Sequence, residues 1–302
     1  MRKLIFVVLG FTLLAQGSIN AQTPSGAVSH YRDGARKVSK GDLDGAIEEY
    51  SRAIAISSRL NSSDSETGET SNITVIDPFT ANAYTNRGVA RYRKGDFEGA
   101  KADFDAALRI RPGLAYAYLN RAATRRELGD LQGALVDLDK AISVQPKLFE
   151  AYNNRGAIRH DLGNLQGALA DFNFAVKLNS DSFEAFYLRG YVRIALKDFD
   201  GALSDFNAAL HLSPREALIY QGRGTAWMYK GRMGEAIADF NAALDRDPGI
   251  VWAYFNRGLA LLVIGEDVRA QADFDRCLAL RPDLKAELDR RAELARSLGA
   301  KK

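Results

Sequence analysis

The stretch ANAYTNRGVARYRKGDFEGAKADFDAALRIRPGL, residues 81–114, decides the fold of this chain because versions of it recur along most of the sequence. One alanine column makes the recurrence plain, because its members follow one another at a constant step of 34 residues: Ala100, Ala134, Ala168, Ala202, Ala236 and Ala270. Self-similarity at a fixed period of this length indicates an array of small repeated units. We therefore expect a repeat protein rather than one or two ordinary globular domains.

Each unit carries two sets of residues at helical spacing, the first being Tyr84, Gly88 and Arg91 and the second Ala100, Phe104 and Ala107. Between the two sets, Gly95 can take the left-handed conformation that ends a helix, and Asp96 can accept backbone N–H groups at the start of the next. Pro112 ends the second helix, because proline cannot continue it. A helical hairpin is therefore predicted from each unit alone.

Further columns keep the same step: a glycine column with one alanine (Gly88, Ala122, Gly156, Gly190, Gly224, Gly258), a second small-residue column (Ala107, Ala141, Ala175, Ala209, Ala243, Cys277), and two mainly aromatic columns that begin at Tyr84 and Phe104. In this order and spacing they resemble the tetratricopeptide repeat (TPR). The resemblance implies an all-α fold, a right-handed superhelical solenoid of seven TPR helix-turn-helix repeats with a C-terminal capping helix. Such arrays need a solvated terminal helix because each repeat buries its apolar faces only against its neighbours.

The repeats are expected at 27–60, 81–114, 115–148, 149–182, 183–216, 217–250 and 251–284, with a polar insertion loop at 61–80 and the capping helix at 285–302. Residues 61–72 are rich in Ser, Thr, Asp and Glu and contain no basic residue, a composition typical of loops. Residues 73–79 are more apolar and offer a segment that could dock on the repeats. In the capping helix, Leu284, Leu288, Ala292, Ala295 and Leu298 are expected on one apolar face.

The first residues form a separate unit, expected to be a signal peptide at 1–21. Arg2 and Lys3 precede an apolar run from Leu4 to Ala15, and polar residues that end in Ile19-Asn20-Ala21 follow. A membrane anchor would need about 20 apolar residues, and this run is shorter. We therefore expect a secreted or periplasmic chain without membrane insertion after cleavage.

Composition narrows the classes of partner. Without Arg2 and Lys3, the 41 basic residues fall to 39 against 38 acidic ones, so the net charge is about +1. Nucleic acid is disfavoured as a partner because phosphate binding needs a concentrated basic surface. Cys277 is the only cysteine, so neither a disulfide framework nor a thiolate metal site is expected.

Two charged columns are interpreted as structural. An arginine column (Arg87, Arg121, Arg155, Arg189, Arg223, Arg257) and an aspartate column (Asp103, Asp137, Asp171, Asp205, Asp239, Asp273) lie on the two helices of each unit. Their fixed register predicts a ladder of charge-assisted hydrogen bonds within hairpins. An Asn-Arg pair at Asn86, Asn120, Asn154 and Asn256 resembles repeats that hold a partner's terminal carboxylate, but the lysine and Gly-Asn signature of that clamp is missing here.

No residue pattern indicates catalysis, so we expect no enzyme activity, no cofactor and no metal. The three histidines, His30, His160 and His211, lie in different repeats without metal-ligand spacing. His160, Asp161 and Glu150 could exchange protons, but no nucleophile accompanies them, so a solvated surface is the favoured interpretation.

The family resemblance implies a concave face lined by the first helix of each repeat, and candidate partner-binding residues follow from it. The middle of the array offers Asn120, Arg126 and Asn154, and the C-terminal part offers Tyr187, Tyr191, Ile194, Met228, Tyr229, Trp252, Phe255 and Leu259. Leu259 and Leu262 have an alternative place in the core, under the terminal helix. The favoured function is a scaffold that holds a protein or peptide partner in this groove, in cell-envelope assembly; the alternative is a structural solenoid that self-associates into homo-oligomers.

The signal-peptide hypothesis predicts a mature N-terminus at or near Gln22, because the apolar run and the polar residues that follow it favour cleavage after Ala21. N-terminal sequencing of the exported protein measures this directly. A membrane-retained chain that still begins at Met1 would show that the run is an anchor.

Overall fold

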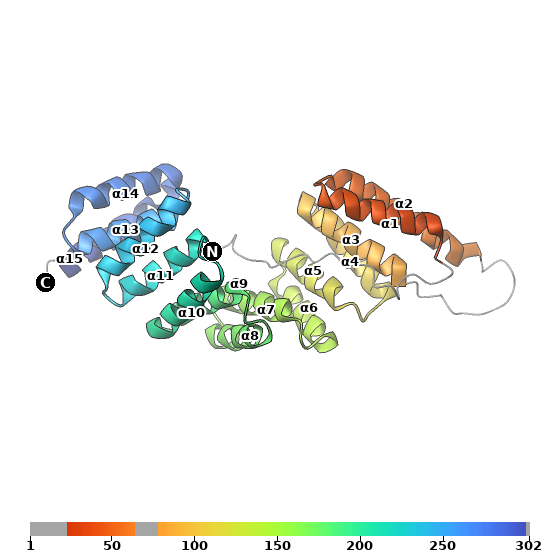
Figure 1. The fold of residues 1–302 in the computed structure, drawn as a ribbon, viewed down its shortest axis with the longest axis horizontal. Helices are drawn as coiled ribbons and strands as arrows, with labels where there is room; N and C mark the ends of the chain where they lie inside the picture. The colour runs from red at the N-terminus through yellow and green to blue at the C-terminus, as the bar shows by residue number, and fades with distance from the viewer. Residues whose placement is uncertain (1–22, 64–77, 300–302) are drawn as a thin grey trace. The chain divides into compact units, whose positions relative to one another are not determined.

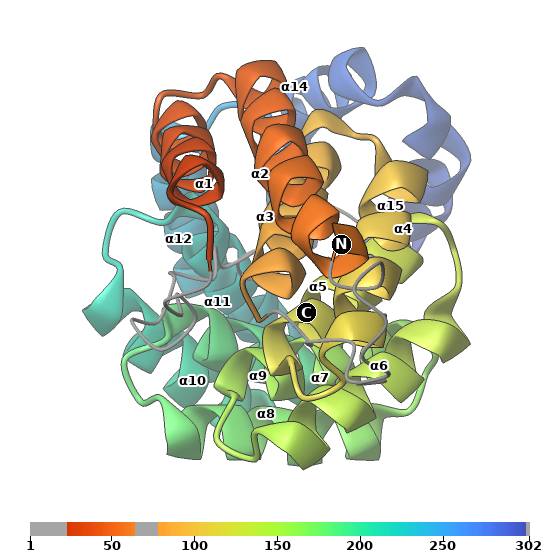
Figure 2. The ribbon, with the colours of Figure 1, turned by 90° about the vertical axis from the view of Figure 1, so that its right-hand side faces the viewer.

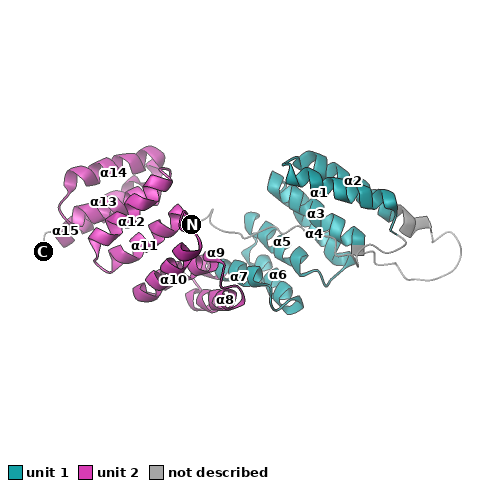
Figure 3. Ribbon diagram, in the orientation of Figure 1, with its two compact units in different colours: residues 1–158 teal, residues 159–302 magenta. Residues whose placement is uncertain are grey.

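The computed structural model of the chain describes residues 23–63 and 78–299, and within these ranges every regular element is a helix (Figure 1). Contacts divide the chain into two compact units, Met1–Ile158 and Arg159–Lys302, with the boundary inside the seventh helix (Figure 3). The expected signal peptide and residues 64–77 of the expected insertion lie outside the described residues. None of the helices within the described part of the chain is long and apolar enough to span a membrane.

The helices of the first unit are α1 (Ser25–Ser39), α2 (Leu43–Ser63), α3 (Pro78–Lys94), α4 (Phe97–Ile110), α5 (Ala115–Glu127), α6 (Leu131–Val144) and most of α7 (Phe149–Asp161). Those of the second unit are α8 (Leu165–Leu178), α9 (Phe183–Ala195), α10 (Phe199–Leu212), α11 (Ala217–Tyr229), α12 (Met233–Arg246), α13 (Val251–Val263), α14 (Asp267–Leu280), the short 3₁₀ helix η2 (Pro282–Leu284) and α15 (Lys285–Gly299).

Consecutive helices pack as hairpins within each unit. In the first unit α1 packs on α2, α3 on α4 and α5 on α6; in the second, α9 packs on α10, α11 on α12 and α13 on α14 (Figures 1 and 2). The second helix of one hairpin also packs on the first helix of the next, as α4 does on α5 and α12 on α13. The all-α repeat fold expected from the sequence is therefore confirmed.

The turn inside each hairpin forms as the sequence predicts. Gly95 has a φ of 88°, in the left-handed region that favours glycine, and the Asp96 carboxylate accepts a hydrogen bond from the Gly99 N–H at 2.9 Å. Asp130, Asn164 and Asp198 cap their helices in the same way. Lys197 is the exception: it takes a φ of 64° at a position where other turns have glycine, and this strain is held by the surrounding hairpin.

Small residues allow the two helices of a hairpin to approach closely. The alanine column from Ala100 to Ala270 is fully buried, and so are the rings of Phe104, Phe206 and Phe240. A side chain added at Gly88 would place its first carbon 2.8 Å from the Phe104 ring, closer than real contacts allow. In the third hairpin, Leu138 stands at the position of the Phe104 ring, and Ala122 stands at the position of Gly88. The smaller side chain on one helix thus goes with the larger one on the other.

Helical structure extends into both ends of the expected insertion. α2 continues to Ser63 and α3 begins at Pro78, so the helices are longer than the repeat boundaries at 60 and 81 suggest. Phe79, from the apolar end of the insertion, is fully buried, and its ring centroid lies 5.4 Å from that of Tyr31. Phe79 therefore packs on the first hairpin.

The C-terminal helix differs in one respect from the expected apolar face. Leu288, Ala292 and Ala295 of α15 are buried against α13, and Leu284 is partly buried in η2. Leu298 was expected on the same face, but half of its side chain is exposed. The buried face is therefore narrower than the sequence pattern indicates.

The glycine column predicts a compensated pair of substitutions. A methyl group at Gly258 would lie 2.4 Å from Cε1 of Phe274, and such overpacking typically costs about 1–3 kcal/mol. Because alanine favours the helix by up to about 1 kcal/mol, we expect a net loss of stability from Gly258→Ala. Adding Phe274→Leu, which copies the natural Ala122–Leu138 combination, should reduce that loss. Thermal unfolding followed by circular dichroism measures both variants, and a Gly258→Ala chain as stable as the natural one would contradict the close-approach argument.

Candidate functional site

The structure separates the candidate partner-binding residues into three groups by burial. Those in the core are Asn120, Asn154, Tyr187, Phe255 and Leu259; those partly buried are Arg126, Tyr191, Ile194 and Met228; those exposed are Tyr229 and Trp252. Candidates of the first group are buried and so do not line an open groove, as expected only for Leu259 in its alternative place. That any of these residues binds a partner stays a prediction.

Neighbouring helices cover the buried apolar candidates. Phe255 and Leu259 pack with Leu288 and Ala292 of α15, which confirms the alternative place for Leu259 in the core and extends it to Phe255. The Tyr187 ring centroid lies 4.9 Å from that of Tyr191 on its own helix and 6.1 Å from that of Phe206 on α10 of the same hairpin. These side chains therefore serve the packing of helices rather than an open surface.

The asparagine column also links neighbouring first helices. Asn86 Nδ2 donates to the Tyr31 hydroxyl at 2.7 Å, and Asn256 Nδ2 donates to Thr225 Oγ1 at 3.2 Å. Asn120 and Asn154 are equally buried. A partner that stays on the surface therefore does not reach these amides.

Among the candidate residues on α9, α11 and α13, five side chains remain reachable from solvent, and we call them the first-helix group: Tyr191, Ile194, Met228, Tyr229 and Trp252. Trp252 is 40% exposed and Tyr229 is 51% exposed. The Tyr229 ring stacks on Phe199 with centroids 5.6 Å apart. Tyr191 is the most constrained member, because its hydroxyl donates to Gln221 Oε1 at 2.6 Å and burial raises its pKa. Tyr229 and Trp252 thus offer the most accessible aromatic surface.

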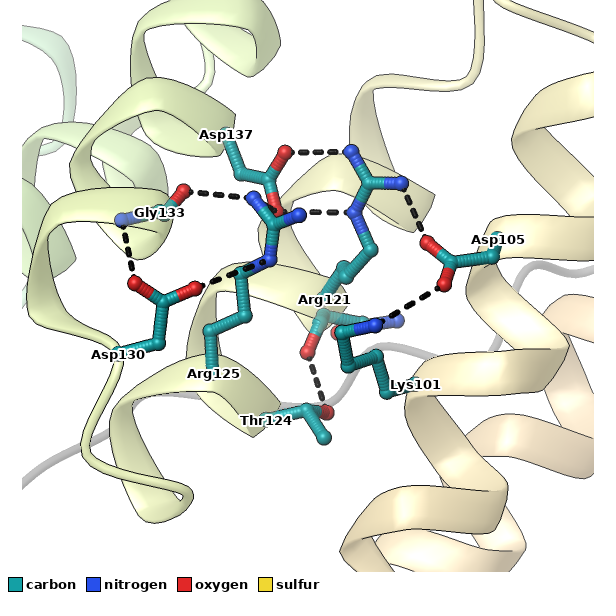
Figure 4. Close-up of polar contacts among 9 residues, drawn as sticks. Lys101, Asp105, Arg121, Thr124, Arg125, Asp130, Gly133 and Asp137 are labelled. Carbon is teal, nitrogen blue, oxygen red and sulfur yellow. Dashed lines mark hydrogen bonds and ion pairs between the residues drawn. The ribbon is translucent and has the colours of Figure 1, made fainter.

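The predicted arginine ladder exists, and each arginine does more than the sequence indicates (Figure 4). Arg121 of α5 donates to both carboxylate oxygens of Asp137 on α6, at 2.9 and 2.6 Å. Its third donor, Nη1, reaches Asp105 on α4 of the preceding hairpin at 2.6 Å. The guanidinium also lies over the Tyr118 ring, 5.5 Å from its centroid. One side chain therefore joins three helices, and we call this arrangement the arginine clamp.

The arginine clamp recurs within both units. Bidentate pairs join Arg87 to Asp103, Arg189 to Asp205, Arg223 to Asp239 and Arg257 to Asp273. The acceptors on the preceding second helix are Ser51, Asn173, Asn207 and Asn241. Arg155 and Asp171, the remaining pair, belong to different units; within its own unit Arg155 donates to Asp139 at 2.6 Å.

Burial and charge act in opposite directions on the clamp. Burial lowers the pKa of Arg121, but the hydrogen bonds and charges of Asp137 and Asp105 outweigh it, so the pKa is raised. For Asp105 burial raises the pKa, yet hydrogen bonds from Arg121 and Lys101 bring it below its usual value. The ion pairs therefore stay charged despite their partial burial.

Sequence reasoning missed a second arginine column. Arg125 Nη1 donates to the Gly133 carbonyl at 2.9 Å and lies 3.0 Å from the Asp137 carboxylate (Figure 4). Arg91 and Arg193 repeat this contact with Asp103 and Asp205. The signal was present in the sequence, because these residues stand four positions after the first arginines and so share their helix face.

The first hairpin uses other residues in the same place. Glu49 replaces the aspartate, and its carboxylate is 2.6 Å from His30 Nδ1 and 3.0 Å from Lys37 Nζ. These hydrogen bonds lower the pKa of Glu49. The sequence change thus preserves a buried acid that is hydrogen-bonded to basic side chains.

Side chains capable of chemistry are scattered. In the described ranges no group of three or more His, Cys, Asp or Glu side chains could hold a metal ion. His160 Nδ1 lies 3.5 Å from an Asp161 carboxylate oxygen. Cys277 is buried in the place of a column alanine, and burial raises the pKa of its thiol.

Comparison with family models gives matches along most of the described chain. A model described as TPR repeat matches residues 122–163. A model described as tetratricopeptide repeat matches residues 81–114, and a second model with the same description matches both residues 159–217 and residues 221–284. Together the matched segments cover more than half of the chain. A comparison of the sequence with curated proteins gave no match.

Solved structures share the fold. A tetratricopeptide repeat protein from Parabacteroides merdae is 24% identical with a TM-score of 0.65, over 89% of this chain and 100% of that one. PilF of Pseudomonas aeruginosa is 18% identical with a TM-score of 0.60, and the match covers 68% of this chain and 97% of PilF. YrrB, described as having an unusual peptide-binding site, is 24% identical with a TM-score of 0.51, and the match covers 65% of this chain and 98% of YrrB.

The arginine clamp predicts a marked loss of stability on truncation. Arg121→Leu leaves the buried Asp137 carboxylate with only Arg125, and breaking a buried pair typically costs about 3–5 kcal/mol; we expect the lower end of this range. Lys101→Leu, which removes a more exposed partner of Asp105, should cost about 1 kcal/mol or less. Chemical denaturation measures the free energies of unfolding. Unchanged or increased stability of Arg121→Leu would show that the fold does not need the clamp.

Proposed function

Because this chain belongs to the tetratricopeptide repeat family, we propose that it is a non-catalytic scaffold that binds a protein or peptide segment on its first helices. The observation that carries the proposal is the exposure of Tyr229 and Trp252 on the first helices α11 and α13. Aromatic side chains concentrate binding energy at interfaces because they offer a large contact area at a small entropic cost. These two residues are therefore the proposed anchors for the partner.

The remaining members of the first-helix group complete the proposed contact surface. Tyr191 and Met228 are already held by their neighbours. Such preorganised side chains lose little freedom when a partner binds. Tyr191 and Met228 would therefore contribute shape, whereas Tyr229 and Trp252 would contribute most of the newly buried area.

The first helices of the first unit offer polar contacts instead. Arg126 is partly buried and Glu127 is exposed at the end of α5. Glu150 at the start of α7 is partly buried, and burial raises the pKa of its carboxyl group. Polar groups of this kind orient a partner and make its association rate sensitive to salt, more than they add affinity.

The proposed setting is the cell envelope. Arg2, Lys3 and the apolar run from Leu4 to Ala15 support export of the chain. A scaffold function after export fits the family's use as an assembly platform. The export signal and the exposed aromatic residues are independent, so each is tested separately.

Affinity capture with the mature chain as bait tests the anchor residues. We expect Tyr229→Ala combined with Trp252→Ala to weaken binding of the captured partner by at least tenfold, about 1.4 kcal/mol, while helicity is unchanged. Phe174→Ala is the matched control, because Phe174 is 52% exposed but lies on the second helix α8. Binding measured by titration calorimetry should be the same for this control and the natural chain.

Two outcomes would contradict the proposal. Equal binding by the double variant would move the contact surface away from the first helices. Light scattering of the pure mature chain addresses the alternative, self-association, which predicts a molecular mass that rises with concentration. A constant monomer mass that coincides with loss of capture by the double variant supports the scaffold function.

A further inference from the structure

The terminal helix α15 does not pack as another repeat would. In α13, Ala253, Asn256 and Ala260 are buried. The residues one repeat further on are Glu287, Arg290 and Leu294, and Leu294 is 60% exposed. α15 instead buries Leu288, Ala292 and Ala295. It therefore contacts the array with a different face from that of the earlier first helices.

The arginine column shows the same departure. Arg291 stands one repeat after Arg257, whose guanidinium joins Asp273 and Asn241 on two second helices. The Arg291 guanidinium bonds to Glu287 on its own helix at 2.5 Å and lies over the Phe255 ring at 5.7 Å. α15 is thus held without the arginine clamp that joins the hairpins.

The surface under α15 is apolar and belongs to α13. Phe255, Leu259 and Leu262 form a cluster with the buried face of α15 (Figure 1 shows α15 beside α13). Trp252, on the same helix, is in ring contact with Phe255 at 5.2 Å and remains 40% exposed. Removal of α15 would therefore expose Phe255 next to Trp252. The aromatic surface proposed to bind the partner would then extend along α13.

The contact between α15 and α13 is small. Only three α15 side chains are buried, two of them alanines. An open depression of about 550 Å³ lies beside the end of α15, lined by Leu262, Val263, Ile264, Gly265, Asp267, Arg296 and Gly299. Because the stabilisation from a contact grows with the apolar area that it buries, this contact holds α15 less strongly than one that buries several large side chains would.

We propose that Phe255, Leu259 and Leu262 form a binding site for an amphipathic helix, and that α15 occupies this site in the free protein. The inference rests on the proposed function and names its partner class. The fitting helix carries aliphatic or small residues at i, i+4 and i+7, as Leu288, Ala292 and Ala295 do, and an arginine at i+3 to stack on Phe255. The partner gains the site by displacing α15, so α15 lowers the apparent affinity and restricts binding to helices that compete with it.

A labelled peptide with the sequence of residues 285–299 is the probe. In the natural chain α15 is tethered by the three-residue η2, so its effective concentration is high and the peptide is excluded. Leu288→Asp in the full chain should dislodge α15 and tighten peptide binding at least tenfold, as measured by fluorescence anisotropy. Leu294→Asp is the matched control, because the same change on the exposed side of α15 should leave the peptide excluded.

Equal peptide binding by the natural chain and Leu288→Asp overturns the proposal when circular dichroism shows both chains folded. If Leu288→Asp does not fold, Ala295→Asp places the charge at the other end of the buried face and carries the same expectation. Failure here is distinct from failure of the scaffold function, because the Tyr229 and Trp252 test uses a chain in which α15 is unchanged.

Discussion

The bidentate hydrogen bond between a first-helix arginine and a second-helix aspartate is the constraint on which the hairpins depend. A carboxylate buried between helices is costly unless all its oxygen lone pairs are used. In the third hairpin, Arg121 and Arg125 together bind both oxygens of Asp137. Because a guanidinium is planar and its donors are fixed, these bonds set the rotation and height of one helix against the other.

The third donor of each arginine extends this constraint from one hairpin to the next. Arg121 reaches Asp105, and Arg257 reaches Asn241, each on the second helix before its own hairpin. Neighbouring hairpins are thus joined by directional bonds as well as by the alanine and aromatic columns. In an array where every unit contacts only its neighbours, such junctions decide how strongly folding of one unit supports the next.

Much of the fold could be predicted because it is determined inside one repeat. The turn at Gly95 and Asp96, the close approach at Gly88 and the pairing of arginine with aspartate all involve residues of a single hairpin. The acceptor of the third donor was missed because it lies in the preceding repeat. From Arg121 onward a constant separation of 16 residues to the acceptor before each arginine was nevertheless available as a signal; only Arg87, whose acceptor Ser51 lies 36 residues earlier, departs from it.

The candidate site could be predicted only in part. Tyr187 and Phe255 have the same helical spacing as exposed residues, but both are buried: Tyr187 against Phe206 of its own hairpin, and Phe255 under α15. Which face a neighbour covers depends on how helices from different repeats cross, and one repeat does not specify this. For Phe255 the covering helix is α15, whose packing breaks the repeat register. Tyr229 and Trp252 are exposed, and their role as partner contacts stays a prediction.

The close fit between Gly88 and Phe104, or between Ala122 and Leu138, also bears on how such arrays change through recombination. Each fit is complete within one repeat, so a duplicated or transplanted hairpin brings its own matching partners. The clamp does not have this independence: a transplanted hairpin brings the arginine, but the recipient must supply a hydrogen-bond acceptor on the preceding second helix, as Asp105, Asn241 and Ser51 do. Shuffling of whole hairpins is therefore restricted at their junctions. The recipient array must already carry a suitable acceptor at the position that the arginine of the new hairpin reaches.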